Sequence, residues 1–169
     1  MARESDNKMK EIQAPNNFKK AERPFVFLAG SIEMNKAIDW QNRATKALSD
    51  VSGTILNPRR KDWDSSWKQE ASDPQFRKQV EWELDAQEQS DLILMFFDPK
   101  TKSPITLMEL GLFHKKSMIV CCPEPFYRKG NVDIVCERYN IKQANSFEEL
   151  IKMAEEKLLS HKYQQEIRG

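Results

Sequence analysis

The most constraining feature of the sequence is a set of short, continuously apolar runs, each followed by a stretch with helical spacing. One run, FVFLA, ends at Gly30 and Ser31, and another, LILMFF, ends at Phe97. A strand that is apolar throughout, with no polar alternation, is typical of a strand buried on both faces. Such strands alternating with helices predict a parallel sheet covered by helices on both sides.

We therefore predict an α/β fold of the Rossmann or flavodoxin type, a single domain with a central parallel sheet of about five strands. Residues 1–23 are polar and aperiodic, which predicts a disordered tail. The domain is expected over residues 24–160, followed by a polar C-terminal tail over 161–169. The expected strands are 25–29, 53–56, 91–97, 118–122 and 139–142, and the expected helices are 36–49, 74–89, 104–116, 131–138 and one beginning at the capping box of 146–149.

Composition narrows the class of protein and of partner. The 169 residues carry a formal net charge of +1, which gives no electrostatic reason to expect nucleic acid or an anionic membrane. No apolar run approaches the roughly 20 residues that span a bilayer. The odd cysteine count, three, argues against a disulfide framework, and two histidines do not support a metal site. We expect a soluble, cytoplasmic protein without a metal or cofactor.

The ends of the strands indicate where a ligand would bind. In open parallel sheets, ligands lie beyond the carboxyl ends of the strands. This rule selects Gly30 and Ser31, Arg59 after Asn57-Pro58, Asp98 after Phe97, and the stretch after Cys122. Backbone amides at such positions favour an anion or a ribose hydroxyl. Arg59 opens a long polar loop that is either a lid meeting a phosphate or a solvated loop of mixed charge.

A glutamate interrupts the apolar helix that follows the most apolar strand. Ser103 is expected to cap this helix, and spacing places Glu109 one turn from Ile105 on one side and from Leu112 and Phe113 on the other. An unpaired carboxylate on such a face is costly or has a raised pKa, so Glu109 either has a partner or serves chemistry. Glu83 lies on the preceding helix. Two carboxylates in one partly apolar crevice suit glycosyl chemistry.

The order and spacing of five motifs resemble the nucleoside 2-deoxyribosyltransferase-like family. They are FLAGSIE (27–33), NPRRKDWD (57–64), FRKQVEWEL (76–84), SDLILMFFDP (90–99) and SPITLMELG (103–111). The resemblance covers about residues 25–158. It implies that Glu109 is the nucleophile and that Glu83 contacts and positions the substrate, at a position where the family often has aspartate.

The resemblance also carries an alternative activity. Six residues before the nucleophile, deoxyribosyltransferases tend to have an aspartate, whereas the related deoxynucleoside monophosphate hydrolases have a serine that holds the 5′-phosphate. This chain has Ser103 there, and Ser31 matches a second phosphate-contacting serine. Family members complete their site from a neighbouring subunit, which here points to Asn131. We therefore expect a homodimer or a higher homo-oligomer.

Three hypotheses follow. The first is an enzyme that transfers the deoxyribosyl group of a 2-deoxynucleoside to another free nucleobase through a covalent glycosyl-glutamate. The second is a hydrolase, an N-glycosidase acting on 2-deoxynucleoside 5′-monophosphates. The third is a nucleotide-binding module without turnover, against which Glu109 and Glu83 argue. The expected substrate contacts in all three are Gly30, Ser31, Arg59, Asp98, Ser103 and Asn131.

Overall fold

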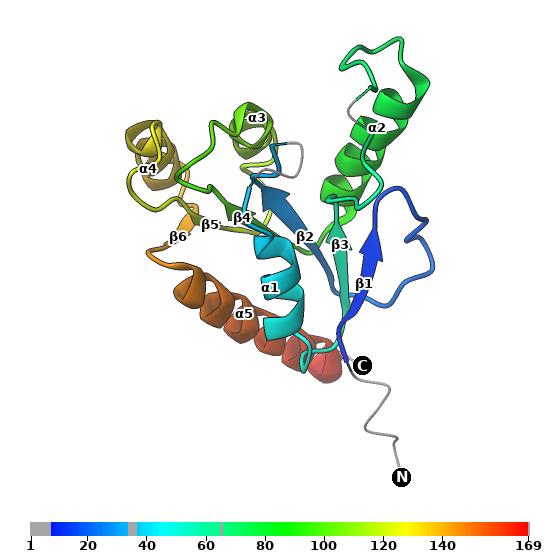
Figure 1. Cartoon of the computed structure of the whole chain (residues 1–169). Coiled ribbons are helices and arrows are strands. Elements are labelled where there is room, and N and C mark those ends of the chain that lie inside the picture. Colours follow the sequence, from blue (N-terminus) through cyan, green and yellow to red (C-terminus); the bar gives the residue numbers. More distant parts are fainter. Residues whose placement is uncertain (1–7, 34–36, 65, 169) are drawn as a thin grey trace.

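A six-stranded, all-parallel sheet forms the centre of the molecule (Figure 1). The computed structural model describes residues 8–33, 37–64 and 66–168. The spatial order of the strands is β1-β3-β2-β4-β5-β6. The strands β3 and β1 therefore lie on one side of β2, and β4, β5 and β6 follow one another on its other side. The strands are β1 (Lys10–Gln13), β2 (Phe25–Gly30), β3 (Thr54–Asn57), β4 (Leu92–Phe96), β5 (Met118–Cys121) and β6 (Lys142–Ala144).

Helices cover both faces of this sheet, as predicted. On one face, α1 (Trp40–Ala47) and α5 (Phe147–Arg168) pack with alternate strand residues into one apolar core. On the other face, α2 (Pro74–Gln89), α3 (Pro104–Leu112) and α4 (Lys129–Arg138) form a second core. The strand β4 shows why its sequence lacks polar alternation: Leu94 lies in the first core and Ile93 and Met95 lie in the second.

The first strand corrects the predicted boundary of the domain. Residues 1–23 were expected to form a tail, yet β1 lies within them and pairs in parallel with β3, with Ile12 opposite Leu56. Phe18 is also buried and packs edge-on against Phe25 and Trp82. This strand gives the sheet six strands where about five were predicted. Because β1 is a polar, half-exposed edge strand, it has no apolar run that would reveal it.

The C-terminal helix also extends past its expected limit. The prediction placed a polar tail at residues 161–169, whereas α5 continues to Arg168. Its capping is as expected, because the Ser146 hydroxyl accepts a hydrogen bond from the Glu149 N–H at 3.1 Å. Within the described ranges, no helix is long and apolar enough to cross a membrane.

The strand order places a topological switch point between the carboxyl ends of β2 and β4. These two strands are neighbours, and the connections that leave them run to opposite sides of the sheet. In folds of this kind, such a switch point is where ligands bind. The helix α3 begins shortly after β4, at this end of the sheet, whereas α2 ends just before β4 begins; a hydrogen bond between Gln87 and Glu109 joins the two helices.

Candidate active site

A cluster of hydroxyl groups occupies the crevice between β2 and β4. Ser31, just after β2, lies with its Oγ 2.5 Å from the Ser103 Oγ and accepts a hydrogen bond from the Asp98 N–H at 2.8 Å. The Thr101 hydroxyl lies 2.8 Å from both serine hydroxyls. Ser31 and Ser103 are both buried. The structure therefore brings together three of the predicted site residues, Ser31, Asp98 and Ser103.

The start of α3 differs from the expected capped helix. Ser103 occupies the N-cap position but makes no side-chain capping bond, because its hydroxyl is turned toward Ser31 and Thr101. Its backbone is left-handed, with φ of 45°. The Ser103 N–H donates instead to Oε1 of Glu33, at 2.9 Å. A carboxylate from the loop after β2 therefore lies at the positive end of α3.

Gln87 joins the Glu109 carboxylate to the backbone of the helix that carries Glu83. The Nε2 group of Gln87 donates a hydrogen bond to Oε2 of Glu109 and another, at 3.2 Å, to the backbone oxygen of Glu83. Gln87 is fully buried, and its Oε1 has no hydrogen-bond partner among the residues that the structure describes. This geometry holds the Glu109 carboxylate beside the helix that carries Glu83.

Burial shifts the proton affinity of both carboxylates upward. It raises the pKa of Glu109 to about 7, while the hydrogen bond from Gln87 acts in the opposite direction. The pKa of Glu83 is raised to about 8, first by burial and then by the charge of Glu109, while a hydrogen bond with Gln79 opposes the shift. Since two nearby carboxylates disfavour a double negative charge, the pair favours holding one proton near neutral pH.

The helix α3 presents Glu109 on its buried side. Only 7% of Glu109 is exposed, and Thr106 and Leu110 are buried with it. Ile105 and Leu112, which the spacing placed on the same apolar face as Glu109, are each 57% exposed. The prediction of a buried apolar face was wrong for these two residues, because the apolar residues of this short helix lie on both of its sides; it is confirmed for Phe113, which is buried.

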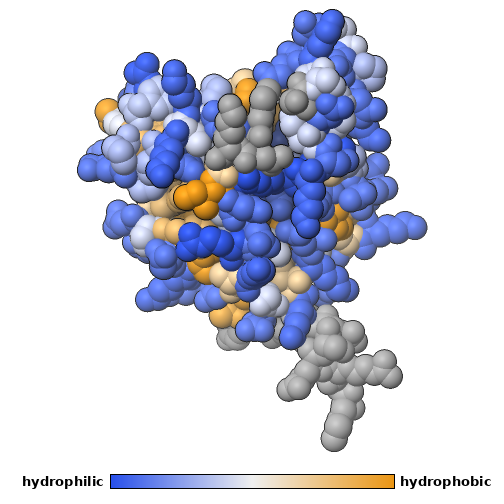
Figure 2. All heavy atoms as spheres, in the orientation of Figure 1, coloured by the Kyte–Doolittle hydropathy of each residue, from blue (hydrophilic) through white to orange (hydrophobic). Residues whose placement is uncertain are grey.

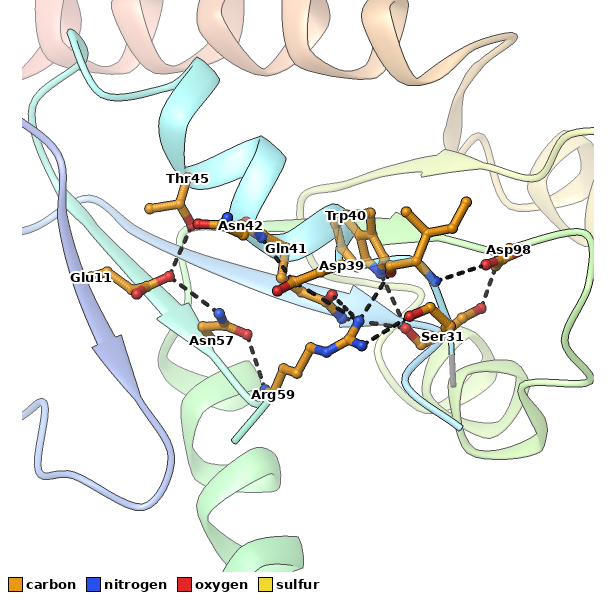
Figure 3. A network of polar contacts seen from close by, with 12 residues as sticks. Glu11, Ser31, Asp39, Trp40, Gln41, Asn42, Thr45, Asn57, Arg59 and Asp98 are labelled. Atoms are coloured by element: carbon orange, nitrogen blue, oxygen red, sulfur yellow. Dashed lines mark hydrogen bonds and ion pairs between the residues drawn. The ribbon is translucent and has the colours of Figure 1, made fainter. Parts of the chain in front are cut away.

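Arg59 connects the end of β3 to the segment between β2 and α1 (Figure 3). Its guanidinium donates hydrogen bonds to the backbone oxygens of Ala37 at 2.9 Å and Ile38 at 3.0 Å, and to Oε1 of Gln41 at 3.2 Å. Gln41 in turn donates to the backbone oxygen of Ser31 at 3.4 Å. Through Gln41, these contacts join Ala37 and Ile38 to the backbone at the end of β2.

The Asp98 carboxylate bonds to backbone groups on two sides of the crevice. Its Oδ2 accepts from the Ile38 N–H at 3.2 Å, and its Oδ1 accepts from the Lys100 N–H at 2.9 Å. Gly30 is needed for close packing at the same place. A Cβ atom there would lie 2.3 Å from the Phe96 backbone oxygen and 2.6 Å from the Trp40 ring. Both residues therefore shape the end of β2.

Asn131 lies apart from the other predicted residues. It is exposed on α4 and has no hydrogen bond to the hydroxyl cluster or to the carboxylates among the described residues. A separate cavity of about 580 Å³ lies beside the same helix, lined in part by Cys122, Lys129 and Asp133. Of the positions selected at the strand ends, only the stretch after Cys122 lines it. The part of the chain that the structure describes contains no group of three His, Cys, Asp or Glu suited to hold a metal ion.

Sequence reasoning missed three residues of this site: Glu33, Gln87 and Thr101. Gln87 follows Glu83 by four residues, so helical spacing places it on the same side of α2. Thr101 lies two residues before Ser103 and three after Asp98, in a turn where a hydroxyl can reach both. Glu33 gives no such signal, because its contact with Ser103 joins residues 70 apart in the sequence.

Comparison with known proteins gives one informative match. Residues 23–126, more than half of the chain, match the family model described as "Nucleoside 2-deoxyribosyltransferase like". This range includes the hydroxyl cluster, Gln87 and both carboxylates, and it ends before Asn131. A search of curated proteins finds no match.

Proposed function

The chain belongs to the nucleoside 2-deoxyribosyltransferase-like family, and from this premise we propose that it cleaves the N-glycosidic bond of 2-deoxynucleosides and transfers the deoxyribosyl group to another nucleobase. The observation that carries the proposal is the buried Glu109 carboxylate, which accepts a hydrogen bond from Gln87 on the helix that carries Glu83. Carboxylates whose pKa is strongly raised by burial are often found at functional sites.

In the proposed reaction, an oxygen of the Glu109 carboxylate attacks C1′ of the nucleoside. The bond from C1′ to the base nitrogen breaks, and the base leaves with that electron pair and takes up a proton. Positive charge develops on the sugar in the transition state, and the carboxylate opposite the base stabilises it. A nitrogen of a second base then attacks C1′ of the glycosyl-Glu109, loses its proton and regenerates the carboxylate.

Glu83 is proposed to position the substrate. Its pKa is raised to about 8 and that of Glu109 to about 7, so Glu83 keeps the shared proton to higher pH. A neutral Glu83 can donate a hydrogen bond to the substrate and does not repel the charge on Glu109. Such a division between two carboxyl groups is how a single site holds an acid and a nucleophile at one pH.

A second candidate reaction is hydrolysis of a 2-deoxynucleoside 5′-monophosphate. It is favoured by the buried hydroxyls of Ser31 and Ser103 at the start of α3, since hydroxyl groups and helix N-termini bind phosphate. Water would then replace the second base as the attacking group. The third candidate, binding without turnover, is disfavoured because a binding module has no need of a buried carboxylate such as Glu109.

The proposed oligomer is supported by the outer surface of α3. Ile105, Met108 and Leu112 are 57–58% exposed and lie along one side of this helix, and Ile134 on α4 is 66% exposed. Most of the surface visible in Figure 2 is hydrophilic, with hydrophobic atoms in small patches. A second copy covering the stripe on α3 would bury these side chains. Asn131 of that copy is proposed to complete the site.

A product assay tests the proposed function. Each deoxynucleoside and each deoxynucleoside 5′-monophosphate is incubated with the protein, with and without a second free base, and products are separated by chromatography. We expect a new deoxynucleoside only when the second base is present, and none with Glu109→Gln. The exposed Glu88, on α2, gives a matched control in Glu88→Gln, which should retain the activity.

Other outcomes of this assay select another candidate. Free base and deoxyribose 5-phosphate formed without an acceptor base would establish the hydrolase. No product from any substrate, from protein shown to be folded, would contradict both reactions and favour the binding module.

A further inference from the structure

Glu33 places a negative charge at the start of α3, next to the hydroxyl cluster. It lies two residues after Ser31 and has a left-handed backbone, with φ of 48°. Its Oε1 accepts the Ser103 N–H at 2.9 Å, so two segments with left-handed residues meet at this contact. Non-glycine residues in this conformation persist only where the surrounding structure holds them.

This contact changes what the start of α3 can bind. The amides at a helix N-terminus attract anions such as phosphate, but in this chain the Ser103 amide already bonds to the Glu33 carboxylate. A carboxylate only accepts hydrogen bonds. The Oε2 atom of Glu33 has no partner among the described residues, and Lys100 and Lys102 of the adjoining loop are exposed and not paired with it. A group next to Glu33 is therefore favoured if it can donate a hydrogen bond and is disfavoured if it is an anion.

The contact of Glu33 with Ser103 lies on the same helix as the proposed nucleophile. Ser103, which Glu33 contacts, precedes Glu109 by six residues, or about 9 Å along the helix axis. A deoxyribose is shorter than this rise, so the side chains of Glu109 and Ser103 would cover the remaining distance when C1′ lies at Glu109 and the 5′ group points toward the start of α3. Its 5′ group would then meet the hydroxyls of Ser31 and Ser103 together with the carboxylate of Glu33.

We infer that Glu33 determines substrate class: it accepts the uncharged 5′-hydroxyl of a nucleoside and repels the 5′-phosphate of a nucleotide. This inference rests on the proposed function, because it assumes that a deoxynucleoside lies between Glu109 and Ser103. It also decides between the two candidate reactions, because the serines alone would suit either 5′ group.

The test compares a deoxynucleoside with its own 5′-monophosphate. We use one purine pair and one pyrimidine pair and measure kcat/KM for the wild type, for Glu33→Gln, and for Glu22→Gln as a control. Glutamine keeps an oxygen that can accept the Ser103 N–H, so the fold at this contact is retained. Glu22 is exposed just before β2, at the opposite end of the sheet from the site, and its substitution changes the net charge equally.

The wild type and Glu22→Gln should prefer the nucleoside over the monophosphate by at least about tenfold, because like charges a few ångströms apart repel even in a solvated site. Glu33→Gln should reduce this preference by at least about tenfold, mainly through a lower KM for the monophosphate. A wild type that prefers the monophosphate, or a Glu33→Gln variant with an unchanged preference, would overturn the inference.

A binding measurement separates this inference from the proposed reaction. Dissociation constants for the same four compounds are determined by calorimetry with Glu109→Gln, with and without Glu33→Gln. Loss of the nucleoside preference on adding Glu33→Gln supports the inference even if the wild type turns over no substrate, which would contradict the proposed function alone. The inference is overturned if adding Glu33→Gln to Glu109→Gln leaves the preference for the nucleoside unchanged, or if none of the compounds binds.

Discussion

Replacing the proposed nucleophile by its neutral isostere should make the protein more stable at alkaline pH. Glu109 is 7% exposed, and burial raises its pKa from 4.5 to about 7. In the unfolded chain the carboxyl group ionises near pH 4.5, whereas in the fold it holds its proton until about pH 7. The favourable contribution of this group is therefore fully present below pH 4.5 and is lost as the pH rises through 7.

The size of the expected stabilisation follows from the pKa shift of Glu109. Each pKa unit corresponds to 1.36 kcal/mol, so a wild-type protein at pH 8.5 carries a penalty of about 3 kcal/mol that Glu109→Gln lacks. The glutamine can still accept the hydrogen bond from Gln87 Nε2, and its own amide can donate to the unpartnered Oε1 of Gln87. For a domain of this size, the difference corresponds to about 6–12 °C in Tm.

The assay is thermal and urea-induced unfolding at pH 5 and pH 8.5 for the wild type, Glu109→Gln and the control Glu88→Gln. The stabilisation of Glu109→Gln should be large at pH 8.5 and small at pH 5, and the control should show no such difference. The same variant should have no turnover. Equal effects at the two pH values, or a variant less stable at pH 8.5, would refute the reasoning that the fold holds a costly charge at this position.

Four further predictions follow from the same contacts. The pH profile of kcat/KM should rise as Glu109 ionises near pH 7 and fall as Glu83 ionises near pH 8, and Glu83→Gln should lack the alkaline limb. Gln87→Ala removes a hydrogen bond that lowers the pKa of Glu109, so its acid limb should move to higher pH and kcat should fall, as steady-state kinetics across pH would measure. Gly30→Ala should cost about 1–3 kcal/mol or more in urea unfolding, because its Cβ would lie too close to the backbone of β4. Phe18→Ala should cost about 3–5 kcal/mol, whereas a residue in a disordered tail would cost nothing.

The parts of the fold that could be predicted are those with a periodic or uninterrupted apolar signal. The strand β4 is buried on both faces, so its sequence has no polar residue that could disguise it, and α2 was predicted over the residues that it occupies. The strand β1 could not be predicted in this way. It is a polar edge strand with one neighbour, and only its pairing with β3 makes it a strand.

In the candidate site, too, some features could be predicted from the sequence and others could not. Glu109 could be singled out because a charge in an apolar helix is unusual, and Glu83 because it lies on the helix before the central strand. The contacts of Ser103 and Arg59 could not be anticipated, since they depend on segments far away in the sequence. Ser103 was expected to cap its own helix, but its hydroxyl bonds to Ser31, 72 residues away, and its amide bonds to Glu33.

The central claim is that Glu109 forms a covalent bond to the sugar. The most direct measurement is mass spectrometry of the protein after incubation with a 2-deoxy-2-fluoro nucleoside, whose fluorine disfavours the charged transition state and prolongs the intermediate. The account predicts one added fluorodeoxyribosyl group per site, located by peptide mapping to Glu109 and absent in Glu109→Gln. A sugar attached to another residue, or turnover of deoxynucleosides by Glu109→Gln at the wild-type rate, would contradict it.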